Sequence, residues 1–249
     1  MDLGIAGKRA AVAASSQGLG FAVAEALAAE GVTVALGSRR REAVEAAAER
    51  IGSAAVPLVA DVSTADGATA FVRDARTALG GIDILVGNAG GPPAGNFATA
   101  SVDQYTSAFE LNCLSTIAMC YEAVPEMRER KWGRVVAITS IAVRQPIAHL
   151  ILSNTARAGL TGFLKTLATE VAGDGVTVNS LLPGLHETAR ITDLYDVDAR
   201  AELAKSVPTG SIGRPEDFGR AAAFLCSEHA RYITGTATPI DGGANAGLL

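Results

Sequence analysis

Seven short apolar runs, rich in Val, Ile and Ala, alternate with longer segments of helical spacing along the whole 249-residue chain. The runs are almost continuously apolar, which is typical of strands buried on both faces of a parallel sheet. A repeated order of strand, helix and strand requires right-handed crossovers, and these place helices on both faces of the sheet. The sequence therefore predicts an α/β fold built on one doubly wound parallel sheet.

The predicted strands cover 9–14, 32–36, 56–60, 84–86, 134–138, 176–182 and 236–240, and the predicted helices cover 19–30, 41–51, 65–79, 102–131, 154–171 and 215–227. Because no repeat, low-complexity tract or linker divides the chain, we expect a single domain over 1–249. The stretch 185–208 is more polar and follows the Pro183-Gly184 break, so we expect a substrate lid there.

The composition restricts the cellular compartment and the classes of partner that we expect for this chain. Charged residues make up 19% of the chain, the net charge is −5, and the only dense basic run is 39–41, which argues against a nucleic-acid surface. The three cysteines form no CxxC pair and fit a reducing compartment. The uncharged stretch 84–102 contains Gly, Asn and Pro, and the first predicted strand begins too early for a signal peptide. We therefore expect a cytoplasmic protein with a small-molecule partner and no nucleic-acid or membrane partner.

A glycine-rich turn at 13–20 joins the first predicted strand to the first predicted helix. In a parallel sheet, such a turn places free backbone N–H groups and the positive end of a helix at the carboxyl edge of the strands, where a dinucleotide pyrophosphate sits. The alternative is a plain turn that happens to contain two glycines. The place of the turn after the first predicted strand favours a dinucleotide-binding site instead. The predicted contacts are Ala14, Ser15, Ser16, Gln17, Gly18, Leu19 and Gly20.

Further short motifs stand at the ends of the later predicted strands. They read Asp61-Val62 after the third strand, GNAG at 87–90 after the fourth, and Pro183-Gly184 with Thr188 after the sixth. Together with the turn at 13–20 and the sequence DGG at 241–243, they resemble the ordered motifs of the short-chain dehydrogenase/reductase family over the whole chain. The likeness is of the 3-oxoacyl-acyl-carrier-protein-reductase type, and it implies a Rossmann-like fold that binds a nicotinamide dinucleotide.

The resemblance assigns these motifs to parts of the cofactor. It implies that Asp61 and Val62 contact the adenine, and that the loop after the sixth strand holds the nicotinamide carboxamide. The cofactor residues implied after the third, fourth and sixth strands are Asp61, Val62, Asn88, Ala89, Gly90, Pro183, Gly184 and Thr188. The chain departs from the family at 13–14, where Ala13 and Ala14 replace Thr and Gly, and at Gly87, which replaces an Asn.

The residues after the second predicted strand bear on the choice of cofactor. An NAD-binding site usually places a carboxylate here for the ribose 2′-OH, but this chain has Ser38, Arg39 and Arg40. A serine hydroxyl and a guanidinium suit the oxygens of a 2′-phosphate. The alternative is that the arginines form a solvated first helical turn, where the positive end of the helix dipole disfavours them. We therefore expect NADP(H) rather than NAD(H).

The resemblance also locates the reaction site, and there the chain departs from the family. It implies catalytic roles for Asn112 and Ser140, but Ser153 stands where the family has its proton-donating Tyr, and Arg157 stands where it has Lys. A serine hydroxyl is too weak an acid to replace Tyr at neutral pH, although it can donate a hydrogen bond to a substrate oxygen. Arg157 keeps a positive charge beside the nicotinamide ribose but does not release a proton.

Two histidines are candidates for the missing acid. His149 lies four residues before Ser153 in a predicted loop, and His186 lies in the loop beside the nicotinamide. An unperturbed His pKa near 6.5 suits proton transfer. The alternative is that His149 is an ordinary loop residue and that His186 points to solvent. We include His149 among the predicted catalytic residues and expect no metal site.

Three functions remain open from the sequence. The first is an NADP(H)-dependent oxidoreductase that reduces a carbonyl, or a conjugated enone or enoyl substrate, at an altered site. The second is an NADPH-binding protein without redox turnover, and the third is an isomerase or dehydratase on the same scaffold. The segments 112–131 and 154–171 carry broad apolar faces, and the resemblance implies that they form the contacts of a homo-oligomer, a tetramer or a dimer.

Overall fold

The strands form one parallel sheet in the order β3-β2-β1-β4-β5-β6-β7 in the computed structural model, which describes residues 1–247. They are β1 (Arg9–Val12), β2 (Thr33–Ser38), β3 (Ala55–Val59), β4 (Ile84–Gly87), β5 (Gly133–Ile138), β6 (Val176–Pro183) and β7 (Ala237–Ile240). The chain builds outward from β1 to β3, returns beside β1 with β4, and then builds outward to β7. The predicted Rossmann-like, doubly wound sheet is confirmed.

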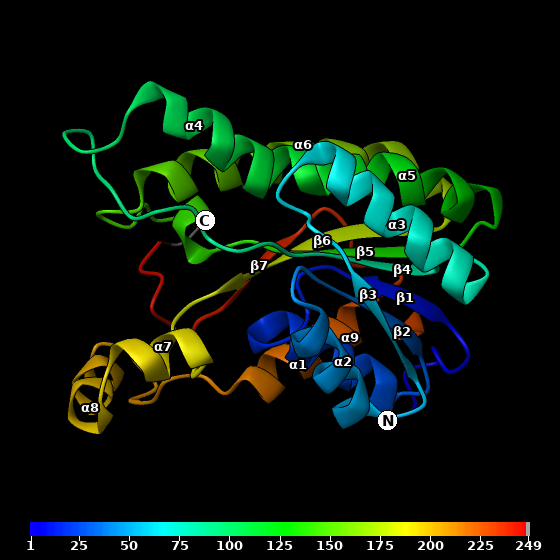
Figure 1. Cartoon of the computed structure of the whole chain (residues 1–249), viewed down its shortest axis with the longest axis horizontal. Helices are drawn as coiled ribbons and strands as arrows, with labels where there is room; N and C mark the ends of the chain where they lie inside the picture. Colours follow the sequence, from blue (N-terminus) through cyan, green and yellow to red (C-terminus); the bar gives the residue numbers. More distant parts are fainter. Residues whose placement is uncertain (248–249) are drawn as a thin grey trace.

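Helices cover both faces of the sheet (Figure 1). One layer contains α1 (Gly18–Ala29), α2 (Arg41–Ile51) and α9 (Pro215–Leu225), and the other contains α3 (Ala65–Leu79), α5 (Ser115–Glu129) and α6 (Ile151–Val171). Successive strand residues face opposite layers, so Leu85 packs toward α3 and α5 while Ile84 and Val86 pack toward α1 and α9. Both layers exclude water from the sheet, which explains why most of the strands are apolar throughout.

All seven predicted strands occur within two residues of their predicted bounds. β1 ends at Val12 rather than at residue 14, because Ala14 adopts a left-handed backbone with φ +46° that no strand contains. β3 is only partly buried, and Val59 is 46% exposed, because the strand lies at the edge of the sheet. β7, at the other edge, is also only partly buried. Burial on both faces is therefore correct for the central strands and wrong for the edge strands β3 and β7.

The segment predicted as one helix over 102–131 consists of three helical parts. α4 (Val102–Phe109) continues through a π-helical turn, η1 (Glu110–Leu114), into α5, which ends at Glu129. A π turn inserts one extra residue into a helix without ending it. It therefore interrupts the regular 3.6-residue periodicity on which the prediction of a single helix rested.

Three further helices differ from the prediction. α1 lies one residue earlier than expected at both ends. α6 begins at Ile151, three residues earlier than expected, so Ser153 lies in its first turn. α9 starts with Pro215 at a first-turn position, as expected, but ends at Leu225. Short 3-10 turns, η2 (Ile141–Val143), η3 (Ala172–Asp174) and η4 (Glu228–Ala230), complete the connections.

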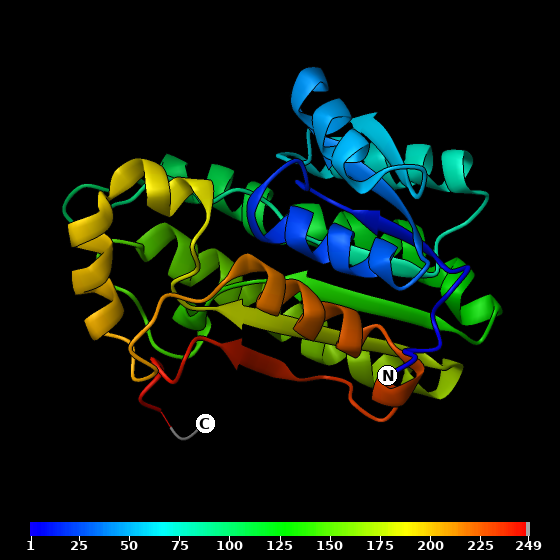
Figure 2. The same cartoon turned by 90° about the horizontal axis from the view of Figure 1, so that it is seen from below.

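The stretch 185–208 contains two helices that the sequence did not predict. α7 (Ala189–Leu194) and α8 (Val197–Lys205) stand beyond the carboxyl ends of the strands, in yellow in Figure 2. Asp196 caps α8 by accepting a hydrogen bond from the Ala199 N–H at 2.8 Å. Their position fits a lid over the strand ends, and its motion stays a prediction. Within residues 1–247, every helix is too short or too polar to cross a membrane.

Candidate functional site

The turn between β1 and α1 is fixed by the neighbouring strands. The Ser15 hydroxyl donates to the Val12 carbonyl at 2.7 Å and accepts the Gly37 N–H at 3.2 Å, which ties the turn to β2. From the end of β4, the Asn88 side-chain amide donates to the Ala14 carbonyl at 3.0 Å. These bonds hold the turn in place although Ala14 has a backbone that favours glycine.

The start of α1 is shaped to receive an anion. Gln17 at the N-cap forms no side-chain capping bond, and the first turn contains no acidic residue. A Cβ on Gly20 would lie 2.6 Å from both the Ala14 carbonyl oxygen and Asn88 Nδ2, so the backbone approaches closely only without a side chain. Uncapped N–H groups at the positive end of a helix are a ready site for phosphate. The turn therefore fits the pyrophosphate of a dinucleotide.

The end of β2 adds polar groups beside this turn. The Ser38 hydroxyl donates to the Ser16 hydroxyl at 3.0 Å, so the first two strand ends present adjacent hydroxyls. Arg39 and Arg40 are exposed and precede α2, with Arg40 at its N-cap position. In the described part of the chain, neither arginine forms an ion pair. Of the alternative reading, the solvent exposure holds for all three arginines, but only Arg41 lies in the first helical turn, because α2 begins there.

The loops after β3 and β6 reach the same edge of the sheet. Asp61 is exposed and accepts the Ser63 N–H at 3.0 Å, whereas Val62 is buried in the core. After β6, the loop turns back over the glycine-rich turn, because a Cβ on Gly18 would lie 3.7 Å from the Thr188 methyl. The sequence motifs at 13–20, 61–62 and 183–188 thus all lie at the carboxyl edge, where open α/β sheets bind ligands.

Asn112 lies in the π turn η1 with only 3% of its surface exposed. Its Nδ2 donates to the Gly90 carbonyl at 2.7 Å, so it joins the helix to the GNAG motif after β4. Its Oδ1 is buried and accepts no hydrogen bond within residues 1–247. A buried acceptor without a donor costs stability. Such an atom is typical of a site where a bound group supplies the missing donor.

A buried guanidinium connects the first turn of α6 to the end of β5. Arg157, 8% exposed, donates from Nε to the Ser153 hydroxyl at 3.2 Å and from Nη1 to the Ile138 and Thr139 carbonyls, each at 3.0 Å. Ser140 follows Thr139 directly, and its hydroxyl accepts the Ala142 N–H at 3.1 Å. Both serine hydroxyls accept an N–H bond, so each retains a proton to donate.

The two candidate histidines occupy different surroundings. His149 is exposed in a loop with φ +64°, and its side chain forms no hydrogen bond or ion pair with the described residues. His186 is 5% exposed, its Nδ1 lies 3.2 Å from the Gly184 carbonyl, and its ring packs edge-on against Phe218 at 5.3 Å between centroids. Burial lowers the pKa of His186, although Gly184, Asp217 and Asp241 oppose that shift. The alternative in which His186 points to solvent is wrong.

Several groups that shape the site are invisible to motif analysis. The Ile138 and Thr139 carbonyls that bind Arg157 are backbone atoms, which any residue supplies. Gly87 is required because a Cβ there would lie 2.7 Å from the Thr116 methyl, so the change from the family's Asn follows from packing. Over residues 1–247, no group of three or more His, Cys, Asp or Glu side chains is arranged to hold a metal ion.

Fold and site together define a Rossmann-type α/β protein whose loops at the carboxyl edge of the sheet fit a dinucleotide. A family model described as enoyl-(acyl carrier protein) reductase matches residues 13–245. Dehydrogenase/reductase SDR family member 4 of Oryctolagus cuniculus is 34% identical, over 98% of this chain and 96% of that protein. The 3-oxoacyl-[acyl-carrier-protein] reductase FabG of Aquifex aeolicus is 31% identical, over 98% and 99% respectively.

A solved structure agrees with this match. The L-sorbose reductase of Gluconobacter frateurii, in complex with NADPH and L-sorbose, superimposes with a TM-score of 0.92 at 34% identity, and the match covers 100% of both chains. The chain therefore belongs to the short-chain dehydrogenase/reductase family, and it is an oxidoreductase of that type.

Proposed function

We propose that the chain is an NADP(H)-dependent oxidoreductase that reduces a carbonyl, or a conjugated enone or enoyl substrate, at an altered reaction site. The observation that carries this proposal is the bonding of Arg157, which links the Ser153 hydroxyl to the backbone next to Ser140. Both hydroxyls are thereby held on one buried scaffold at the carboxyl edge. Asn112, bonded to the GNAG loop, is the third side chain of the proposed reaction site, with Ser140 and Ser153.

The proposed roles follow from the hydrogen-bonding state of each group. The bound cofactor supplies the hydride. Because Arg157 donates to Ser153 Oγ, it polarises that hydroxyl and strengthens the hydrogen bond that Ser153 offers to a substrate oxygen. Ser140 offers a second hydrogen bond, so negative charge developing on the oxygen is stabilised by two oriented donors.

The proton that completes the alcohol comes from another group, because neither Ser nor Arg releases one at neutral pH. His149 stays our predicted donor, since it lies in the exposed loop that leads into α6. His186 is a poor donor, because its ring is enclosed by packing and its pKa lies below its usual range. Loss of turnover in His149→Gln, with turnover retained in His186→Gln, would support these two assignments.

Support for NADP(H) comes from the end of β2. Ser38, Arg39 and Arg40 present a hydroxyl and two cations without a carboxylate that would repel a 2′-phosphate. The L-sorbose reductase, which is similar over its whole length, binds NADPH. The residues that would hold the cofactor are those of the glycine-rich turn, the end of β2, and the loops after β3, β4 and β6.

The test is NADPH oxidation with a panel of ketones, conjugated enones and acyl thioesters. We expect turnover that Ser140→Ala reduces by about a hundredfold or more, because it removes one donor to the developing oxyanion. The matched control is Ser53→Ala, since Ser53 is exposed on a turn after α2. Turnover unaffected by Ser140→Ala would overturn the role given to Ser140.

The second candidate is an NADPH-binding protein without redox turnover, and the same bonding of Arg157 favours it. A guanidinium engaged with three acceptors is well suited to hold structure, and the site has no strong acid in the position of the family's Tyr. Tight NADPH binding, with no oxidation by any member of the panel, would support this candidate and overturn the first one. No observation in the structure favours the isomerase or dehydratase.

Three further expectations stay predictions. A homo-oligomer is supported by the exposed apolar side chains of Leu114, 46% exposed, and Tyr121, 74% exposed, on one continuous helical segment. A lid function for 185–208 is supported by the place of α7 and α8 beyond the strand ends. The cytoplasmic location is supported by the cysteine pattern.

A further inference from the structure

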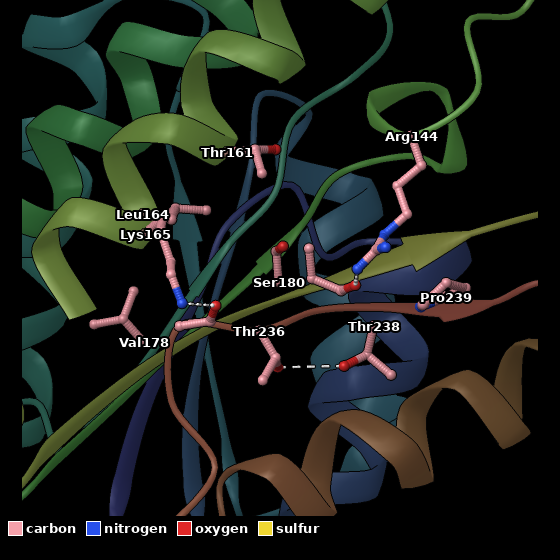
Figure 3. A pocket seen from close by; sticks show the side chains of 11 residues that line it. Arg144, Thr161, Leu164, Lys165, Val178, Ser180, Thr236, Thr238 and Pro239 are labelled. Atoms are coloured by element: carbon pink, nitrogen blue, oxygen red, sulfur yellow. Dashed lines mark hydrogen bonds between the residues drawn. The ribbon is translucent and has the colours of Figure 1, made fainter. Parts of the chain in front are cut away.

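A cavity of about 530 Å³ lies between α6 and the edge strand β7, and it is lined by none of the residues assigned above to the cofactor or the reaction (Figure 3). Its volume falls within the ~300–1,000 Å³ of ordinary small-molecule sites. The lining residues are Arg144, Thr161, Leu164, Lys165, Val178, Ser180 and the segment 235–239.

The charge of this cavity is entirely positive. Arg144 and Lys165 reach toward β7 from two sides, and no Asp or Glu is among the described residues that line the space. Arg144 Nη2 donates to the Ala237 carbonyl at 2.9 Å, and Lys165 Nζ donates to the Gly235 carbonyl at 3.1 Å. These bonds draw both exposed cations toward β7. A guanidinium has five N–H donors and an ammonium has three, so both keep donors for a ligand.

A serine hydroxyl lines the cavity beside the two cations. Ser180 is only 2% exposed, and across residues 1–247 its side chain has no hydrogen-bond partner. Alternation along β6 places Ser180 on the same face as Val178, which packs in the core layer of α6. The hydroxyl therefore keeps its proton, which a ligand in the cavity can accept.

Other hydroxyls surround the same space. Thr161 donates to the Arg157 carbonyl at 2.9 Å and lines the α6 side. Thr236 and Thr238 share a hydrogen bond of 3.2 Å on the β7 side. Because Thr236 also donates to Asn179 Oδ1 at 2.9 Å, Thr238 is the donor in this bond, and the threonine protons are already used. The donors left for the oxygens of a tetrahedral anion are Arg144, Lys165 and the Ser180 hydroxyl, and Leu164, Val178 and Pro239 leave apolar room for a compact organic body.

We propose that this cavity binds a small molecule that carries a dianionic oxyanion of the phosphate type, between Arg144 and Lys165 and above the Ser180 hydroxyl. The site is separate from the dinucleotide edge and does not depend on the function proposed above. Two positive side chains balance the charge of one phosphate dianion, and hydrogen bonds from charged donors are the strong ones. A singly charged carboxylate is the weaker ligand.

The first experiment titrates inorganic phosphate into the full chain by isothermal calorimetry. We expect the double variant Arg144→Gln, Lys165→Gln to bind phosphate at least about tenfold more weakly, because each removes a charged donor. The matched control is Arg39→Gln, Arg40→Gln, which removes two cations from the end of β2, beside the glycine-rich turn that could also bind phosphate. This control variant should bind phosphate in the cavity as tightly as the unaltered protein does.

Two results would overturn the proposal. One is that phosphate binding is lost in the Arg39, Arg40 variant and unchanged in the Arg144, Lys165 variant. The other is that the unaltered protein shows no binding up to about 10 mM phosphate, which is weaker than an ordinary specific site.

A second measurement keeps the test decisive if the double variant fails to fold. Crystals of the unaltered protein are soaked in tungstate, a tetrahedral dianion with strong anomalous scattering. We expect an anomalous peak between Arg144 and Lys165, within hydrogen-bond distance of Ser180 Oγ. Ser180→Ala should reduce the peak and weaken phosphate binding severalfold without changing the net charge. Absence of a peak in this cavity would contradict the proposal.

Discussion

Replacing Arg157 with Met tests whether the guanidinium is a structural tie. The Arg157 side chain is buried and binds the Ser153 hydroxyl and the carbonyls of Ile138 and Thr139. Methionine fills a similar, unbranched space, so packing changes little. The substitution leaves three buried acceptors without this donor, at about 1–3 kcal/mol each, and recovers the desolvation cost of one buried cation. We expect a net loss of about 2–4 kcal/mol in the free energy of unfolding.

The measurement is urea unfolding at fixed protein concentration, followed by the fluorescence of Trp132, the single Trp, and by far-UV circular dichroism. Arg157→Lys should lose less, because it keeps the charge but not the planar fork. Arg41→Met is the matched control, since the Arg41 side chain is 71% exposed and pairs with Glu45 only at 3.4 Å. It should change stability by under about 0.5 kcal/mol. A loss below about 1 kcal/mol for Arg157→Met, with an unchanged denaturant slope, would refute the reasoning.

Two further predictions concern His186 and Ala14. Burial holds the pKa of His186 below its usual range, so the unfolded chain takes up a proton before the folded chain does as the pH falls below about 6.5. Stability should therefore decline from pH 7 toward pH 5, and His186→Gln should flatten that slope in urea unfolding at several pH values; an identical slope would contradict this. Ala14→Gly should raise stability by about 0.5–1 kcal/mol, because it relieves a left-handed backbone at φ +46°. The opposite change is expected for Ala46→Gly, which should lose about 1 kcal/mol in exposed α2; a loss for both would show that the Ala14 backbone is unstrained.

The strands were predictable because their apolar runs are short and bounded by Gly, Pro or polar residues. Arg41–Ile51 and Ala65–Leu79 were predicted to the residue, since regular periodicity coincides with clear boundaries such as Thr64 and Gly80. α7 and α8 were missed because they are short and polar, so no apolar stripe marks them. The early end of β1 was missed because Ala14 gives no sign of a positive φ.

The positions of the candidate site residues were predictable from motifs, but their contacts were not. Spacing alone placed Ser153 and Arg157 one helical turn apart, and the bond between them follows from that spacing. The bonds from Arg157 to β5 depend on how α6 packs over the sheet, which a single sequence does not specify. The burial of His186 likewise depends on Phe218 from a distant helix, so local polarity suggested solvent and tertiary packing decided otherwise.

The π turn at Glu110–Leu114 has a consequence for the whole segment from α4 to α5. One added residue rotates everything beyond it by about 100° relative to an uninterrupted α-helix. The buried positions of α4 and those of α5 therefore follow two separate phases of the same periodicity. Deleting one residue within 110–114 would turn the buried stripe of α5, including Met119 and Ala123, away from α3 while leaving the helix itself intact. The π turn therefore lets one continuous helical segment place Asn112 at the site and still bury the apolar side chains of α5 in the core.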